Sequence, residues 1–337
     1  MRRNREVPAG TVKRLTVDSD VLVGNLLGEP SRREVDVYLP AGFSSGSGVP
    51  LLVDLVGFTG SGFSHTAWRN FGENAVERLD RLIGSGGMAP VAVAFPDCFT
   101  RLGGNQYVNS AAMGRWEDFL IDELLPEVEE GFGCGGPGRR GVFGKSSGGY
   151  GAIVHAMRHP NVWSAAACHS GDMGFELLFG GDFPRALRVL TRHGGSVEQF
   201  IAAFERNEKP KDDDVHALMT LAMAATYDPD PTAFLGVRLP VDLHTCERIE
   251  ERWRNWLAWD PLTMVAELGP GLRALKALYI DCGDVDQYNL VYGARRFHRA
   301  LEQLDVPHRY EEFPDDHSKV DYRMDVSLPY LAAALSG

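Results

Sequence analysis

The most constraining feature of the sequence is the glycine-rich segment GVFGKSSGGYGA at residues 141–152. Residues 144–148 fit the pattern G-x-S-x-G, in which a serine occupies a sharp turn between a strand and a helix. The flanking positions require glycine because a Cβ atom there would collide with the adjoining strand or helix. Apolar residues precede the turn, and residues 150–157 follow it with a helix-like pattern. The pattern therefore predicts that Ser146 is a nucleophile raised above the edge of a sheet.

The same segment contains Gly144-Lys145-Ser146, which is similar to the end of a phosphate-binding loop. That loop needs a glycine five residues before its Gly-Lys pair, and position 139 is Arg139. The spacing excludes a nucleotide-binding loop of this kind.

Charge and composition exclude several other classes of function. The chain has 337 residues and a formal net charge of −12, which disfavours binding to nucleic acid or to an anionic membrane surface. No stretch approaches 18 apolar residues, and the start of the sequence lacks the apolar segment of a secretory signal. The five cysteines are scattered without metal-ligand spacing. We expect a cytoplasmic protein with reduced thiols and without a metal ion or cofactor, and the sequence leaves open whether it forms a homodimer.

Strand-like and helix-like segments alternate along much of the chain. Strands are expected at 11–17, 34–39, 51–56, 91–95, 142–143, 163–168, 275–280 and 309–313. Helices are expected at 68–83, 116–130, 150–157, 293–304 and 326–335. This alternation indicates an α/β fold with a mainly parallel sheet covered on both faces. Residues 172–265 contain helical segments but no expected core strand, so we interpret them as a helical cap inserted within a single domain that spans residues 1–337.

A serine hydroxyl needs a neighbouring base, and that base needs a carboxylate to orient it. With a G-x-S-x-G turn, the chain order is serine, carboxylate and histidine, each at the end of a strand. His317 follows the last expected strand, whereas the other candidates lie on or near helices or precede the acid (His155, His159, His193 and His169). For the acid we favour Asp286, three residues after the turn glycine Gly283, with Asp284 as the alternative.

The negative oxygen that forms during acyl transfer needs two backbone N–H donors. One is expected at Ser147, directly after the nucleophile and at the start of a helix. The other is expected at Phe58, in the glycine-rich loop that follows the strand at 51–56.

Two segments are candidates for substrate contact. Gln106, Tyr107 and Asn109 lie on a polar loop after the strand at 91–95, where an ordinary surface loop is the alternative. Trp253 and Trp256 belong to a stripe of tryptophans spaced every three residues, a pattern that indicates helix packing more often than an apolar lid. Asp172, shortly after the strand at 163–168, is a further candidate.

Together, Gly57-Phe58-Thr59, residues 144–152, Gly283-x-x-Asp286 and Asp316-His317-Ser318 resemble the esterase D family of α/β-hydrolases. That group includes S-formylglutathione hydrolases, feruloyl esterases and mycolyl transferases of the antigen 85 type. The resemblance covers roughly residues 10–170 and 260 to the end. It implies a nucleophile at Ser146, an acid at Asp286, a base at His317, and oxyanion donors at Phe58 and Ser147.

The chain departs from this family in two respects. S-formylglutathione hydrolases usually carry His-Ser-Met where this sequence has Lys145-Ser146-Ser147, and their insertion is shorter than 172–265. We expect a serine carboxylesterase that hydrolyses short-chain or aryl esters, small-molecule substrates, through an acyl-enzyme on Ser146. The alternatives are a thioesterase of the S-formylglutathione hydrolase type, an acyltransferase, and a non-catalytic binding protein with the same fold, which would lack a member of the triad.

Overall fold

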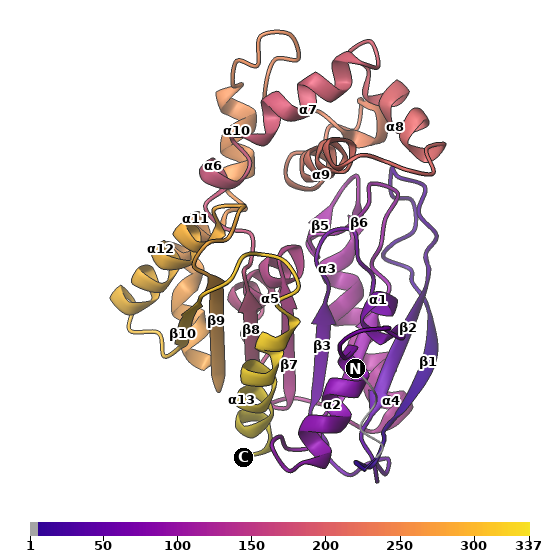
Figure 1. The fold of residues 1–337 in the computed structure, drawn as a ribbon, viewed down its shortest axis with the longest axis vertical. Helices are drawn as coiled ribbons and strands as arrows, with labels where there is room; N and C mark the ends of the chain where they lie inside the picture. The colour runs from indigo at the N-terminus through magenta and orange to yellow at the C-terminus, as the bar shows by residue number, and fades with distance from the viewer. Residues whose placement is uncertain (1–5) are drawn as a thin grey trace.

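The computed structural model describes residues 6–337 and is shown as a ribbon in Figure 1. Residues 1–5, on which the expectation about a secretory signal partly rests, lie outside the described residues. No helix within residues 6–337 is both long enough and apolar enough to cross a membrane.

The centre of the molecule is an eight-stranded sheet with the strand order β1-β2-β4-β3-β7-β8-β9-β10. Its strands are β1 (Thr11–Asp18), β2 (Arg32–Leu39), β3 (Leu51–Leu55), β4 (Ala92–Pro96), β7 (Arg140–Lys145), β8 (Ala165–His169), β9 (Ala277–Gly283) and β10 (Arg309–Phe313). β2 pairs antiparallel with both β1 and β4, and the other neighbours are parallel. The inner strands β3, β4 and β8 are buried at every residue, as expected for a sheet covered on both faces. The expected mainly parallel sheet is confirmed.

Helices cover both faces of this sheet. α2 (Ala75–Gly84) and α13 (Met324–Ser336) pack their apolar residues on one face. The other face is covered by α3 (Trp116–Asp118), the π-helical segment η1 (Phe119–Leu124), α4 (Leu125–Phe132), α5 (Ser147–Arg158) and α12 (Leu290–Gln303). Three short elements lie in connecting segments, namely the strand pair β5 (Asn109–Ser110) and β6 (Gly114–Arg115) and the 3₁₀ turn η4 (Asp321–Arg323).

One expected helix begins later than the sequence pattern suggests. Residues 68–74 are not helical; α1 (Gly62–Thr66) precedes them, and α2 begins at Ala75. The side chain of Asn74 accepts a hydrogen bond from the N–H of Glu77 at 2.8 Å, and the Glu77 carboxylate accepts one from the N–H of Asn74. This capping box fixes the start of the helix. The prediction of a helix from Trp68 is therefore wrong at its N-terminal end.

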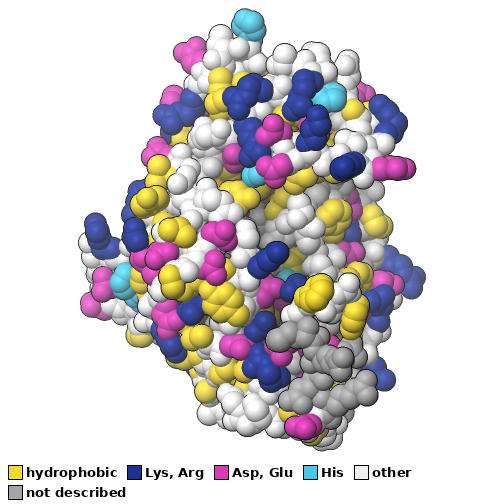
Figure 2. Space-filling view, viewed as in Figure 1, with side chains coloured by type: hydrophobic (Ala, Val, Ile, Leu, Met, Phe, Trp, Pro, Cys, Tyr) yellow, Lys and Arg dark blue, Asp and Glu magenta, His cyan; other side chains and the backbone are white. Residues whose placement is uncertain are grey.

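The described residues of 172–265 contribute no strand to the sheet. They form α6 (Phe175–Leu178), α7 (Asp182–Thr191), α8 (Val197–Glu205), α9 (Asp212–Tyr227), the 3₁₀ turn η2 (Phe234–Gly236), α10 (Glu250–Leu257) and the start of α11 (Pro261–Leu268), which leads into η3 (Gly269–Ala274). Helices α6 to α10 form a separate layer over one end of the sheet (Figure 1). In Figure 2 the surface is hollowed between this layer and the sheet, and acidic and basic side chains are interspersed around it.

The strand-to-helix turn requires glycine on both sides of Ser146. A Cβ atom at Gly144 would lie 2.3 Å from the carbonyl oxygen of Leu55 on β3, and one at Gly148 would lie 1.7 Å from the same oxygen. Real Cβ atoms do not approach a backbone oxygen so closely, so the packing of α5 against β3 depends on these two glycines.

We expect Gly148→Ala to destabilise the protein by about 3 kcal/mol or more, because the new methyl group must separate α5 from β3. Gly131→Ala is the matched control: it lies in α4 with open space around the added atom, and we expect it to be neutral or to stabilise by up to about 1 kcal/mol. Urea unfolding of both variants measures the difference. Equal midpoints for Gly148→Ala and the wild type would contradict this account.

Candidate active site

Ser146 lies at the turn between β7 and α5. Its backbone has φ 59° and ψ −125°, a conformation that a non-glycine residue rarely adopts. Its N–H donates to the carbonyl of His169 at 3.0 Å, and its carbonyl accepts from the N–H of Tyr150 at 2.8 Å. These bonds hold the strained turn in place, and such strain is typical of functional residues.

His317 and Asp286 form a hydrogen-bonded pair in the loops after β10 and β9. The His317 Nδ1 lies 2.8 Å from the Asp286 Oδ2, and both residues are largely buried, at 9% and 6% exposed. The other carboxylate oxygen of Asp286 accepts from the N–H of Tyr288 at 2.9 Å. An ionised carboxylate only accepts hydrogen bonds, so this contact suits the imidazole tautomer with the proton on Nδ1, in which Nε2 is free to accept a proton.

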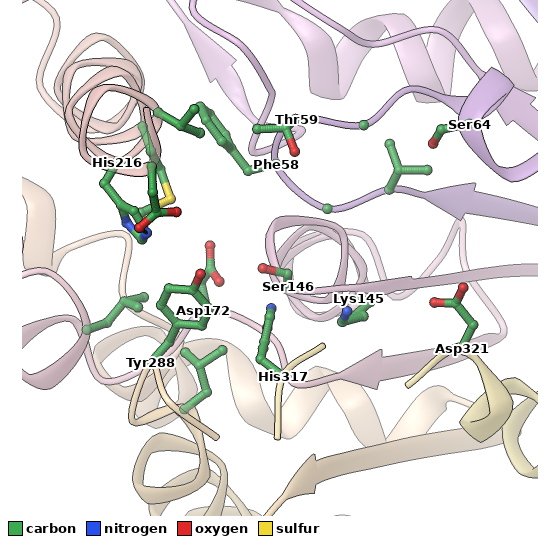
Figure 3. Close-up of a pocket in the computed structure, with 18 of the residues that line it drawn as sticks. Phe58, Thr59, Ser64, Lys145, Ser146, Asp172, His216, Tyr288, His317 and Asp321 are labelled. Atoms are coloured by element: carbon green, nitrogen blue, oxygen red, sulfur yellow. Dashed lines mark ion pairs between the residues drawn. The ribbon is translucent and has the colours of Figure 1, made fainter. Parts of the chain in front are cut away.

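The loop around His317 is fixed by two further contacts. Its backbone N–H donates to the side-chain oxygen of Gln287 at 2.9 Å. The ring of Tyr288 packs edge-on against the imidazole, with 4.9 Å between centroids. Figure 3 shows the imidazole pointing toward Ser146, and both residues line the same cavity. By contrast, Asp284, the alternative acid, is exposed and makes no hydrogen bond with His317 among the described residues.

The two expected N–H donors flank Ser146. Ser147 is the first residue of α5, and the loop of Phe58 passes close to Ser146: a Cβ atom at Gly57 would lie 3.4 Å from the Cβ of Ser146. Within residues 6–337, neither the N–H of Phe58 nor that of Ser147 donates to a protein acceptor. Two unused donors beside a nucleophile can stabilise a negative oxygen.

The cavity above Ser146 has a volume of about 520 Å³ and two chemically different walls. One wall comes from the helical layer of residues 172–265 and from α12. It is mostly apolar, with Leu178, Phe179, Val215, Met219 and Leu290, and it also includes Asp212 and His216 of α9. The other wall is polar and comes from α1, β7 and η4; it includes Ser64, His65, Lys145 and Asp321. Sequence reasoning missed this polar wall because its members share no motif and are far apart in the chain.

The polar loop after β4 does not reach the cavity lining. The amide of Gln106 is buried and donates to the Oγ of Ser147 at 2.9 Å and to the Oδ2 of Asp172 at 3.1 Å. The hydroxyl of Tyr107 donates to the carbonyl of Val56 at 2.6 Å. Asn109, also expected at the substrate, instead donates from its amide to Asp118 at 2.8 Å. Gln106 and Tyr107 therefore support residues of the site from outside the cavity, whereas Asn109 has its partner elsewhere.

Trp253 and Trp256 also lie away from the cavity lining, in the interior of the helical layer of residues 172–265. They are 2% and 0% exposed and pack edge-on against Phe183, with centroids 5.7 and 5.5 Å apart. Trp256 also packs against Phe179, at 5.6 Å. The two tryptophans therefore pack helices together and do not form a lid. This is the interpretation that their spacing favours.

Asp172 does line the cavity, beside the start of α5. Burial raises the pKa of its carboxyl to about 6, against the opposing effect of hydrogen bonds from Gln106 and Ser147. The Ser147 hydroxyl lies 3.3 Å from its Oδ2. A carboxyl with this pKa is mostly ionised at neutral pH and protonated below pH 6, so it can change the charge of the cavity in a mildly acidic medium.

The raised pKa of Asp172 predicts a specific pH dependence of stability. Between about pH 4 and pH 6 the unfolded chain loses this proton while the folded chain keeps it, so the folded wild type loses stability as the pH rises through this range. Asp172→Asn removes this group. The free energy of unfolding of the variant minus that of the wild type should therefore be larger at pH 7 than at pH 4, by on the order of 2–3 kcal/mol. The measurement is urea unfolding at both pH values. Asp18→Asn, at an exposed position, is the control, and an equal change in both variants would contradict the prediction.

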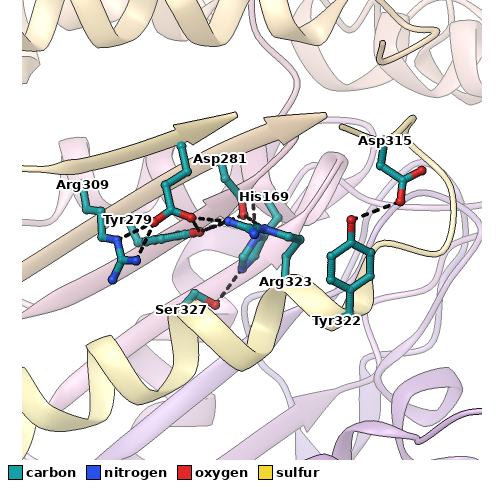
Figure 4. A network of polar contacts seen from close by, with 9 residues as sticks. His169, Tyr279, Asp281, Arg309, Asp315, Tyr322, Arg323 and Ser327 are labelled. Carbon is teal, nitrogen blue, oxygen red and sulfur yellow. Dashed lines mark hydrogen bonds and ion pairs between the residues drawn. The ribbon is translucent and has the colours of Figure 1, made fainter. Parts of the chain in front are cut away.

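A second Ser-His-Asp arrangement lies inside the protein (Figure 4). The Nδ1 of His169 is 2.7 Å from the Oδ1 of Asp281, and its Nε2 is 2.8 Å from the Oγ of Ser327. All three residues are at most 2% exposed, and the Nε of Arg323 donates to Asp281 at 2.8 Å. No substrate can reach this buried serine, so the network serves to attach α13 to the sheet.

We expect Ser327→Ala to destabilise the protein by about 1–3 kcal/mol, because it leaves the buried Nε2 of His169 without a partner. Ester hydrolysis per folded molecule should stay within about twofold of the wild type. Thermal unfolding together with steady-state kinetics tests both statements. A large loss of kcat in a fully folded variant would instead give this network a part in the chemistry.

Comparison with known proteins identifies the family. The model of the Esterase family matches residues 29–327, and the chain belongs to this family. A search of curated proteins found no match. The esterase resemblance seen in the sequence is confirmed, and the protein is a carboxylic ester hydrolase that acts on small-molecule esters.

Three solved structures with similar folds share less than 20% sequence identity with this chain. A ferulic acid esterase has 19% identity and a TM-score of 0.61, with 97% of this chain and 99% of that chain covered. FphF, a fluorophosphonate-binding serine hydrolase of Staphylococcus aureus, has 15% identity and a TM-score of 0.59, with 96% and 99% covered. An S-formylglutathione hydrolase of Agrobacterium tumefaciens has 15% identity and a TM-score of 0.58, with 97% and 96% covered. The chain has the α/β-hydrolase fold of these proteins.

Proposed function

We propose that Ser146, His317 and Asp286 are the catalytic triad of a serine carboxylesterase. The observation that carries this proposal is the pairing of His317 with Asp286 at 2.8 Å, on the same cavity as a serine held at φ 59°. The buried carboxylate of Asp286 fixes the protonated Nδ1 of His317, which leaves Nε2 as the base that faces Ser146.

In this mechanism His317 removes the proton of the Ser146 hydroxyl as its oxygen attacks the ester carbonyl. The resulting negative oxygen accepts hydrogen bonds from the N–H groups of Phe58 and Ser147, which together form the oxyanion hole. His317 then gives the proton to the leaving alcohol, and the acyl group remains on Ser146. Water, deprotonated by the same histidine, attacks the acyl-enzyme and releases the carboxylic acid.

The shape of the cavity supports short-chain or aryl esters as substrates. Its volume of about 520 Å³ is typical of a small-molecule site, and the wall supplied by the cap is mainly apolar. This chemistry needs no metal ion or cofactor. We propose in addition that residues 172–265 are a cap within one domain, and that the protein is cytoplasmic, for which the five unpaired cysteines are the supporting observation among the described residues.

Hydrolysis of 4-nitrophenyl acetate, butyrate and octanoate by the wild type and by Ser146→Ala tests the triad. We expect kcat to fall by roughly 10⁴-fold or more in the variant, because the nucleophile is removed. A fluorophosphonate probe, read by mass spectrometry, should label Ser146 in the wild type. Ser327→Ala is the matched serine control and should keep both activity and labelling. Absence of hydrolysis and of labelling in the folded wild type would overturn the proposal.

A further inference from the structure

Lys145 has an unusual position in the candidate active site. It occupies the variable position directly before Ser146 in the turn, and its partly buried side chain lines the cavity. Figure 3 shows it between Ser146 and Asp321, on the polar wall. Burial lowers the pKa of its ammonium group, while the neighbouring carboxylates have the opposite effect. Within residues 6–337, no carboxylate oxygen lies within 4.0 Å of this ammonium.

The acidic groups around Lys145 are engaged with other partners. Asp321 forms an ion pair with Arg69 at 2.7 Å, and Asp286 is bonded to His317. Asp316 is exposed to solvent, and its carboxylate accepts from the N–H of Ser318 at 2.6 Å. Lys145 is therefore a cation on this wall that has no direct counter-ion among the described residues.

The other cationic group of the wall is already neutralised. His65 lies against the buried Asp54, with 2.5 Å between Nδ1 and the carboxylate. Burial alone would lower the pKa of His65, but Asp54 raises it overall, so a positive charge formed here is matched by the carboxylate below it. The charge in excess on the polar wall is that of Lys145.

A partly desolvated ammonium without a counter-ion is an attractive site for an anion. One cation matches one negative charge, and the carboxylate of Asp172 on the same cavity would repel a doubly charged group such as a phosphate monoester more strongly than a carboxylate. We propose that Lys145 binds a carboxylate of the substrate, so that the enzyme prefers esters that carry a free carboxylate. Residues Leu178, Val215 and Met219 on the opposite wall would then contact an apolar part of the same molecule. This inference rests on the triad proposed above.

Two matched pairs of esters test this preference. Mono-4-nitrophenyl adipate against 4-nitrophenyl hexanoate places the carboxylate on the acyl side, and 4-acetoxybenzoate against 4-acetoxybenzamide places it on the leaving group. In at least one pair, we expect the wild type to have a higher kcat/KM for the anionic ester. The ratio of anionic to neutral kcat/KM should fall by about 10–100-fold in Lys145→Met, because a charge-assisted hydrogen bond is lost.

Two further variants control for charge and shape. Lys145→Arg keeps the cation and should recover part of the ratio. Lys319→Met removes the same charge from an exposed lysine two residues beyond His317, outside the cavity lining, and should leave the ratio within twofold of the wild type. Labelling of each variant by a neutral fluorophosphonate shows that the turn around Ser146 is intact.

The pair in which the Lys145→Met variant loses its preference for the anionic ester identifies the subsite. A lower ratio in the adipate pair assigns Lys145 to the acyl group. A lower ratio in the acetoxybenzoate pair assigns it to the leaving group. Either result supports the inference. Equal losses for anionic and neutral esters, or no anionic preference in a wild type whose hydrolysis depends on Ser146, would overturn it and leave the triad intact. A wild type that is neither active nor labelled would overturn both proposals.

Discussion

The close approach of α5 to β3 is the physical constraint on which the rest of the site depends. Because Gly144 and Gly148 have no Cβ atoms, the helix can begin directly against the carbonyl of Leu55. That contact forces the chain through a tight turn, and Ser146 takes the left-handed φ of 59° that the turn requires. The same contact brings the loop after β3, with the N–H of Phe58, beside the start of α5. One packing interaction thus positions Ser146 and the two N–H groups that we propose as the nucleophile and the oxyanion donors.

The sequence predicted best those features that follow from strand order. Polar residues after the ends of neighbouring parallel strands must meet at one edge of the sheet, so the meeting of His317 with Asp286 could be expected although the two lie 31 positions apart. Their catalytic roles, and those of Ser146 and the N–H donors, stay predictions until the kinetic test is made. The fold and the esterase class followed from the same motifs, since few other folds use a G-x-S-x-G turn between a strand and a helix.

Of the features that the sequence analysis missed, one has a local cause and the others depend on long-range packing. The capping box at Asn74 determines the start of α2. The predicted start is too early because apolar residues before Asn74 continue the helical pattern. The environment of Lys145 depends on the pairing of Arg69 with Asp321, 252 positions away, which no local pattern reveals. Helical spacing alone also does not say whether Trp253 faces a ligand or other rings.

The apolar wall of the cavity has a consequence for how this enzyme can diversify. Leu178, Val215 and Met219 belong to the segment between β8 and β9, whereas the proposed triad lies at the strand ends of the sheet layer. Insertions or replacements in the cap can therefore reshape what the cavity accepts while the reacting groups keep their geometry. Substrate recognition and the chemical step thus depend on different segments of the chain. Selection can therefore change the substrate preference without changing the reacting groups.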